Sequence, residues 1–202
     1  MTNLKSKSKS KSISAAMVFA ITALSATAAF ADAASAGKYT LDAGHAGVSF
    51  SVSHMGYSNV QGRFNDLAGD FEIKPAGKSV VNFTIKSASV DTAHDKRDKH
   101  LRSPDFFNSK LYPEINYTSH DVEFNAQGEI TKINGSLKLL GKTRPVSIDV
   151  VALKAAQDPW GNYRVGYQAS TKIKRSEFGM NFMQGGIGDD IALNISFEAI
   201  KQ

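Results

Sequence analysis

The chain has 202 residues and no cysteine, with 42% apolar and 21% charged residues, which fits one globular domain with or without a processed segment. The absence of cysteine excludes a disulfide framework, thiolate metal sites and a cysteine nucleophile. Four of the lysines behind the formal net charge of +5 lie in residues 1–31, which contain no acidic residue. The remaining 20 basic and 19 acidic side chains leave a net charge of +1, which disfavours nucleic-acid binding.

Residues 1–31 have the three-part layout of a secretory leader. Lysines at alternate positions over residues 5–11 precede an apolar stretch over residues 13–24. That stretch is too short to cross about 30 Å of hydrocarbon as a stable helix. Small residues then offer signal-peptidase sites after Ala31 and after Ala33. The pattern predicts a cleaved signal peptide and a periplasmic mature chain, with an uncleaved membrane anchor as the alternative.

From residue 38 onward, apolar side chains recur at every second position, which is typical of strands with one buried face. Such runs cover Val48–Val52, Val60–Phe64, Phe71–Ile73, Val81–Ile85, Ile115–Tyr117, Val122–Phe124, Ile133–Leu139, Val146–Val150, Tyr163–Ile173 and Ile191–Phe197. A change of parity predicts a β-bulge near Ser119–Asp121. No helical segment long enough for a strand crossover separates the runs. Residues 32–202 are therefore predicted to form one antiparallel barrel or sandwich.

One segment, Asp91–Lys110, lacks the two-residue period. Asp91 or Thr92 can cap a short helix that runs to about Leu101, and Ser103-Pro104-Asp105 has the composition of a second helix start. We therefore expect a short helical insert over about residues 92–110, at the rim of a barrel or over its mouth.

Several motifs in fixed order make the chain similar to the YceI family (UPF0312), periplasmic lipocalin-like proteins that bind polyisoprenoids. They are Tyr39-Thr40-Leu41-Asp42, His54-Met55-Gly56, Gly62-x-Phe64, Val90-Asp91-Thr92, Arg97-Asp98-x-His100-Leu101-Arg102-Ser103, Asp105-Phe106-Phe107, Tyr112-Pro113, Gly141-x-Thr143-x-Pro145-Val146 and Arg175-Ser176-Glu177-Phe178-Gly179-Met180. The resemblance implies an eight-stranded antiparallel barrel around an elongated apolar cavity, often as a homodimer. It also implies a non-catalytic carrier of a long-chain amphiphile, such as an isoprenoid quinone, a prenyl pyrophosphate or a fatty amide.

An eight-stranded barrel is just wide enough to hold one slender ligand or to be filled by side chains. Roughly fifteen buried tail carbons would contribute about 12 kcal/mol, at about 0.8 kcal/mol each, against an association cost of about 4 kcal/mol or more. The predicted tail-binding residues are apolar or aromatic, and each could equally be core filler: Phe50, Val52, Phe64, Phe71, Phe83, Ile85, Phe106, Phe107, Tyr117, Phe178 and Met180.

A basic cluster of Arg97, His100 and Arg102 is the candidate head-group site, because paired guanidinium groups can bind a pyrophosphate bidentately. The alternative is a solvated helix in which Arg97 pairs with Asp95 or Asp98. No histidine pair has metal-ligand spacing, so we expect no metal site and hydrogen-bonded structural roles for His45 and His54. Nucleophile-elbow and phosphate-loop motifs are absent. The sequence predicts neither enzymatic activity nor a cofactor other than the bound lipid.

Two other classes fit the alternation. A small outer-membrane barrel has the same period with its apolar face turned to lipid. A ligand-free β-sandwich interaction module would have a filled core and no cavity. The family resemblance and the charged insert favour the carrier without stable membrane insertion over the outer-membrane barrel. A co-purifying small molecule would separate the carrier from the sandwich.

Overall fold

The computed structural model describes residues 33–74 and 78–202, so the predicted leader lies outside the described residues. Its strands are β1 (Gly37–His54), β2 (Ser58–Phe64), β3 (Leu67–Ile73), β4 (Val80–Lys86), β5 (Val90–Asp91), β6 (Glu114–Phe124), β7 (Ile130–Leu139), β8 (Lys142–Gln157), β9 (Tyr163–Lys174) and β10 (Ile187–Lys201). The helices are α1 (Asp95–Leu101) and the short 3₁₀ helices η1 (Ser87–Ser89) and η2 (Arg175–Phe178).

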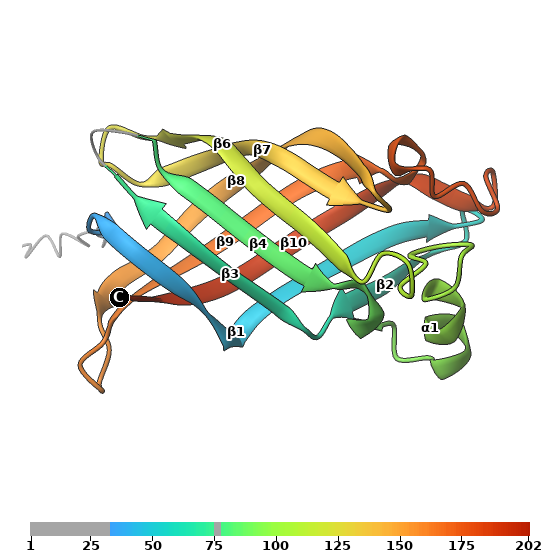
Figure 1. Cartoon of the computed structure of the whole chain (residues 1–202), viewed down its shortest axis with the longest axis horizontal. Coiled ribbons are helices and arrows are strands. Elements are labelled where there is room, and N and C mark those ends of the chain that lie inside the picture. The colour runs from blue at the N-terminus through green and yellow to red at the C-terminus, as the bar shows by residue number, and fades with distance from the viewer. Residues whose placement is uncertain (1–32, 75–77) are drawn as a thin grey trace, which may run out of the picture. The chain divides into compact units, whose positions relative to one another are not determined.

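All strand pairs are antiparallel, and they close into a barrel (Figure 1). Strands β2 and β3 follow one another along the same edge of β1, and β5 and β4 pair with them in turn. Strands β6 to β10 continue as a meander, and β10 pairs back with β1. The strands thus occupy eight positions, which confirms the predicted eight-stranded lipocalin-like barrel.

Alternation along the strands decides which side chains face inward. On β1, Val48 and Phe50 are buried and Ser49 between them is exposed; on β7, Leu137 and Leu139 are buried around exposed Lys138. Successive side chains of a strand point to opposite faces, so the barrel interior is apolar and its outward face is polar.

The structure agrees with only part of what the sequence predicts for the β-bulge and the helical insert. The register between β6 and β7 shifts between Ser119 and Asp121, which confirms the predicted bulge. Helix α1 is shorter than the predicted insert and is capped by His94, whose ring nitrogen accepts the Arg97 N–H at 3.3 Å. The prediction of a cap at Asp91 or Thr92 is therefore wrong.

The expected second helix start at Ser103 is also wrong. The carbonyl oxygen of Ser103 accepts the backbone N–H of Phe106 at 3.1 Å and of Asn108 at 2.9 Å. Residues 103–107 therefore form turns and not a second helix. Helix α1 and these turns lie at one end of the barrel, beside the β1–β2 turn and the connection from β9 to β10 (Figure 1).

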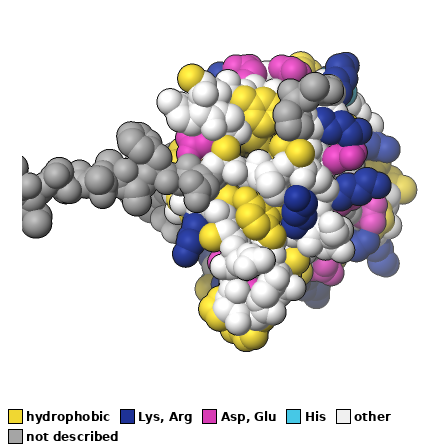
Figure 2. Space-filling model, turned by 90° about the vertical axis from the view of Figure 1, so that its left-hand side faces the viewer, with side chains coloured by type: hydrophobic (Ala, Val, Ile, Leu, Met, Phe, Trp, Pro, Cys, Tyr) yellow, Lys and Arg dark blue, Asp and Glu magenta, His cyan; other side chains and the backbone are white. Residues whose placement is uncertain are grey.

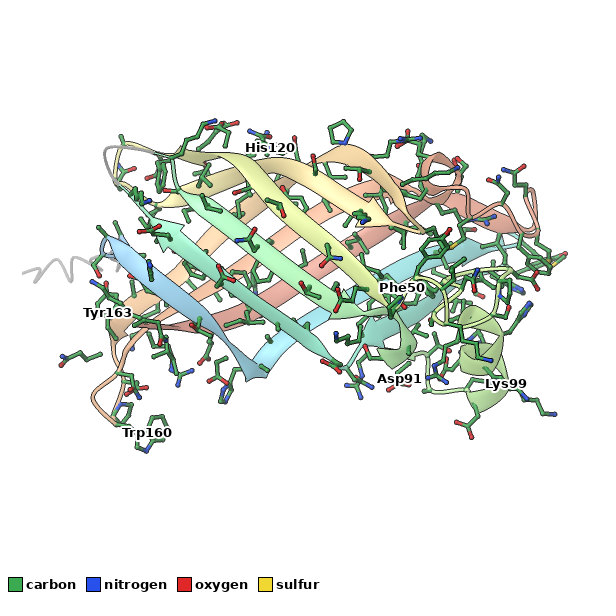
Figure 3. All side chains as sticks on the ribbon, viewed as in Figure 1. Phe50, Asp91, Lys99, His120, Trp160 and Tyr163 are labelled. Carbon is green, nitrogen blue, oxygen red and sulfur yellow. The ribbon has the colours of Figure 1, made fainter. Side chains whose placement is uncertain are left out.

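The other half of the barrel is filled by aromatic rings. Phe71 stacks on Tyr39 with centroids 4.9 Å apart, and Phe197 lies 5.3 Å from Phe83 and 5.4 Å from Tyr167. Beyond this core, at the end that carries Tyr163 and the exposed Trp160 (Figure 3), charged side chains of both signs surround scattered apolar ones (Figure 2). Within residues 33–74 and 78–202, no helix has the length and apolarity needed to span a membrane.

Candidate functional site

An apolar cavity of about 320 Å³ occupies the half of the barrel next to α1. Among the rings of the filled half, around Phe71, Tyr167 and Phe197, lies a pocket of about 10 Å³. The cavity volume is at the lower end of the range for small-molecule sites, about 300–1,000 Å³. This hollow is confined to one end, in contrast to the elongated cavity that the family resemblance implies, and its size suits one slender apolar chain.

Most of the predicted tail-binding residues line this cavity. Strands β1, β2 and β4, the turns after α1 and the segment after η2 supply them: Phe50, Val52, Phe64, Ile85, Phe106, Phe107 and Met180. Figure 3 shows Phe50 toward the α1 end of the barrel. The ring of Phe64 contacts Phe107 edge to face at 5.4 Å, so the insert packs directly on the strand wall.

Four predicted tail-binding residues lie outside the cavity wall. Phe71 and Phe83 belong to the aromatic core of the filled half, and Phe178 is buried within η2. The Tyr117 hydroxyl donates to the carbonyl oxygens of Ile133 and Val146, each at 3.1 Å. Alternation alone could not separate these positions from the cavity-lining ones, because both sets face the interior.

The basic cluster divides in the same way. Arg97 and His100 line the cavity, whereas Arg102 donates to the carbonyl oxygens of Ala88 and Val90, each at 2.7 Å. Arg97 does not pair with either neighbouring aspartate. It donates to the Thr92 hydroxyl at 2.7 Å and to the Thr92 carbonyl at 2.8 Å.

Three rings meet where the insert approaches the segment after η2. His100, Phe106 and Phe182 contact one another edge to face at centroid distances of 5.0 to 5.2 Å, and all three line the cavity. The His100 ring is also hydrogen-bonded to Asp105 at 2.8 Å. Phe182 was not identified from the sequence, since it lies in an irregular segment without periodicity.

Gly62 leaves room for a cavity-lining ring. It is paired with Phe50 across β1 and β2, and a Cβ at this position would lie 2.7 Å from both Phe50 Cε1 and Thr92 Cγ2. We expect Gly62→Ala to destabilise the fold by about 1–3 kcal/mol, because the ring has to move. Urea unfolding measures this change. The control is Gly47→Ala on β1, where a Cβ meets nothing within 4 Å; equal stability of the two variants would contradict the prediction.

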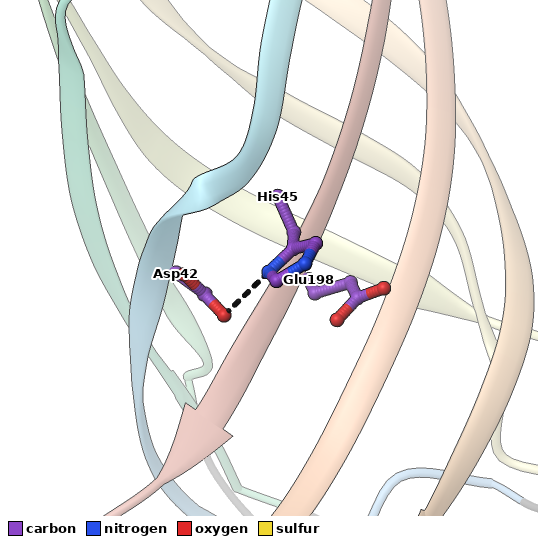
Figure 4. A group of neighbouring side chains, drawn as sticks. All are labelled: Asp42, His45 and Glu198. Carbon is purple, nitrogen blue, oxygen red and sulfur yellow. Dashed lines mark hydrogen bonds and ion pairs between the residues drawn. The ribbon is translucent and has the colours of Figure 1, made fainter.

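A second polar cluster lies on the outward face, away from the cavity. Ligand-type atoms of Asp42, His45 and Glu198 lie within 4.8 Å of one another (Figure 4). The Arg164 guanidinium contacts Asp42 at 2.5 Å and Glu198 at 2.8 Å, so these carboxylates already have a cationic partner. His45 is hydrogen-bonded to Asp42 at 2.9 Å, in agreement with the structural role predicted for it.

Asp42 makes the stability of this cluster dependent on pH. Its hydrogen bonds from Arg164 and, to a smaller extent, His45 lower the pKa of the carboxyl group from 3.8 to about 2. A lowered pKa in the folded state stabilises the protein above the unfolded pKa, and this contribution is lost as pH falls through the folded pKa. We therefore expect Asp42→Asn to cost about 1–2 kcal/mol at neutral pH, with the difference from wild type vanishing between pH 3.8 and about 2.

Urea unfolding across this pH interval tests the prediction. The matched control is Asp149→Asn, which removes an exposed ion pair to Lys132 at 3.5 Å and should change stability by less than about 1 kcal/mol. A difference between Asp42→Asn and wild type that persists unchanged down to the most acidic condition would contradict it.

Comparison with known proteins agrees with the fold. The YceI-like domain family matches residues 39–199. A UPF0312 protein of Shewanella baltica is 40% identical over 174 residues, 84% of this chain and 91% of the relative. The YCEI protein of Campylobacter jejuni is 32% identical with a TM-score of 0.62, covering 74% of this chain and 90% of that one. A polyisoprenoid binding domain from Saccharophagus degradans, 18% identical, has the same fold with a TM-score of 0.63, over 81% and 98% of the two chains. The chain belongs to the YceI-like domain family.

Proposed function

We propose that this protein is a non-catalytic carrier that shelters the apolar tail of one long-chain amphiphile in the cavity beside α1. The observation that carries the proposal is the hollow of about 320 Å³ with an almost wholly apolar wall. Each methylene transferred into such a wall contributes about 0.8 kcal/mol. Binding therefore needs neither a metal nor a covalent step.

A polyisoprenoid, such as an isoprenoid quinone or a prenyl pyrophosphate, is the ligand class that we propose. The structural neighbour from Saccharophagus degradans is described as a polyisoprenoid binding domain, and a prenyl chain is slender and free of polar atoms. Because the Phe71 half of the barrel is filled, a tail longer than the cavity would leave part of its length outside.

Polar side chains on the outward face support the carrier over an outer-membrane barrel, whose outward face is apolar. Gln168, Ser170 and Lys172 on β9 alternate with more buried neighbours. Because β10 pairs with β1 and closes the sheet, the fold is a barrel and not the β-sandwich that was the other alternative.

Asp91, His100 and Ser103 have the residue types of a catalytic triad, but their hydrogen bonds lead to other residues. His100 bonds Asp105 at 2.8 Å, and Asp91 accepts from Asn65 at 3.1 Å. The Ser103 hydroxyl accepts the backbone N–H of Asp105 at 3.3 Å. None of these hydrogen bonds joins two of the three residues Asp91, His100 and Ser103, so they do not form a paired nucleophile and base.

Mass spectrometry of an organic extract of the purified protein tests the proposed function. We expect a single class of long-chain amphiphile in the extract. Wild-type protein that yields no such molecule and binds no added long-chain ligand would refute the proposal.

We further propose that residues 1–31 are removed on export and that the mature protein is periplasmic. N-terminal sequencing of the osmotic-shock fraction should then give a chain that starts at Asp32 or Ala34. A chain that retains Met1 would contradict this. The family resemblance implies a homodimer, and sedimentation analysis of the same material tests this oligomeric state.

A further inference from the structure

A groove of mixed polarity, more polar than the cavity, lies on the other side of one wall of the apolar cavity. It measures about 330 Å³ and is formed by the β1–β2 turn and by the segment that leads into β10. Ser53, Arg175 and Ile187 line both the cavity and the groove. The rest of the groove wall is largely polar or glycine, including Gln184 and Gly185. The apolar cavity and the more polar groove therefore meet at Arg175.

Arg175 is a buried cation that forms no ion pair at contact distance. Its side chain is 3% exposed, and within the described part of the chain no carboxylate lies within 4.0 Å of it. Its three nitrogens donate to the carbonyl oxygens of Gly188 at 2.9 Å, Met180 at 2.7 Å and Ile187 at 3.0 Å. A guanidinium has five N–H groups, so one N–H on each terminal nitrogen is left over. Burial also lowers the pKa of Arg175, an effect that a bound anion would oppose.

The charged side chains that line the cavity favour an anion. The cavity wall contains Arg97, Arg175, His54 and His100 and no acidic residue among those described. The groove contains one acidic side chain, Asp189. Its two carboxylate oxygens accept the Ser176 backbone N–H at 2.9 Å and the Ser176 hydroxyl at 2.8 Å. These hydrogen bonds lower the pKa of Asp189, so its carboxylate stays charged and offsets part of the charge of Arg175 from beyond ion-pair distance.

We infer that Arg175 binds the acidic head group, a carboxylate or a phosphate, of a single-tailed amphiphile whose head lies in the groove and whose tail lies in the cavity. The two spare N–H groups match two oxygens of either anion. The inference rests on the proposed function and adds to it the site and the chemical class of the head group.

Arg97 is the other cavity-lining arginine, but it is only half-buried. Water and salt screen an exposed charge, whereas a charge in a low-dielectric wall attracts an anion more strongly. The position of Arg175 between the apolar cavity and the more polar groove also matches the two parts of an amphiphile. These differences favour Arg175 over the mouth formed by α1.

A ligand series on the wild-type protein tests the head-group class. We expect hexadecanoic acid and hexadecyl phosphate to bind about 10- to 100-fold more tightly than methyl hexadecanoate and hexadecanamide, which share the tail but carry no charge. Calorimetric titration at neutral pH measures the four affinities. Equal affinities would overturn the inference and leave the proposed function standing. No binding by any of the four would also overturn the inference, and together with an organic extract that contains no long-chain amphiphile it would overturn the proposed function.

Location is tested on the same wild-type protein with a photoreactive diazirine placed next to the carboxylate of a long-chain acid. We expect labelled peptides from residues 53–56 or 184–189. Labelling that falls on residues 94–107, or on neither groove segment, would overturn the inference.

A substitution gives an independent measure. Arg175→Gln should reduce the affinity ratio of acid to ester toward one, while Lys174→Gln, which removes the same charge from an exposed neighbour bonded to Asp190, should keep it. Near-ultraviolet circular dichroism checks that the variant is folded. If Arg175→Gln does not fold, the labelling result on the wild-type protein decides. A folded Arg175→Gln that keeps the full ratio would overturn the inference.

Discussion

Replacing Leu137 with tryptophan is expected to weaken the binding of a long-chain ligand about 100-fold. Leu137 lies on β7 and points into the cavity beside α1. The larger side chain would occupy the space of about four methylenes, worth about 3 kcal/mol of tail burial. The free volume should limit the stability change to about 1–3 kcal/mol. Displacement of a fluorescent fatty-acid probe measures the affinity, and urea unfolding measures the stability.

Lys138→Trp is the matched control for this variant. It introduces the same side chain one residue along the same strand, where the position is exposed on the outward face. We expect its ligand affinity to stay within about twofold of wild type, because single surface substitutions rarely exceed about 0.5 kcal/mol. Equal ligand affinities in the two variants would show that the tail does not occupy this cavity.

Phe71→Ala should have the opposite profile, with a large loss of stability and little change in ligand affinity. Phe71 is 4% exposed, and it contacts Tyr39, Tyr167 and Phe197 in the filled half of the barrel. Truncating such a ring removes its transfer free energy and leaves a void, at a cost of about 3–5 kcal/mol. Urea unfolding should show this loss, while probe displacement below the unfolding transition should remain near the wild-type value.

The conservative variant Phe71→Leu controls for ring loss, and it should cost less than Phe71→Ala because more of the volume is kept. If Phe71→Ala weakened binding as much as Leu137→Trp, the tail would extend into the filled half and the separation of the two halves would be wrong. A stability loss below about 1 kcal/mol would contradict the buried contacts of this ring.

The strand pattern was predictable because it depends on local alternation. Val48 and Phe50 face inward for the same reason that Ser49 faces outward, and a change of parity was enough to locate the bulge at Ser119–Asp121. The helical insert was predictable only as a break in that period. Its cap fell at His94 because Asp91 and Thr92 are used by other partners, Ala93 and Asp98.

The division of the barrel into a filled and a hollow half was not predictable from the sequence. Phe71 and Phe64 have the same residue type, the same strand alternation and similar burial, yet Phe71 packs in the core and Phe64 lines the cavity. What separates them is which rings arrive from distant strands. Phe71 meets Tyr167 and Phe197, while Phe64 meets Phe107 of the insert.

Arg175 shows a different limit of sequence interpretation. It belongs to a family motif, but nothing in its neighbours in sequence indicates that it is buried. Its carbonyl partners come from Met180 and from Ile187 and Gly188 at the start of β10, so only the fold brings them together. The spacing of the motif therefore could not predict that Arg175 is buried and hydrogen-bonded to backbone carbonyl groups.

The seam between β1 and β10 joins the two ends of the described chain, from Tyr39 opposite Lys201 to His54 opposite Ile187. Because β10 follows all the other described strands in the chain, this edge of β1 has no partner until β10 has been synthesised. An unpaired strand edge is a template for aggregation. Proteolytic loss of the fifteen residues of β10 would thus open the barrel between β1 and β9 and release a bound ligand. It would also leave β1 and β9 as two unpaired strand edges.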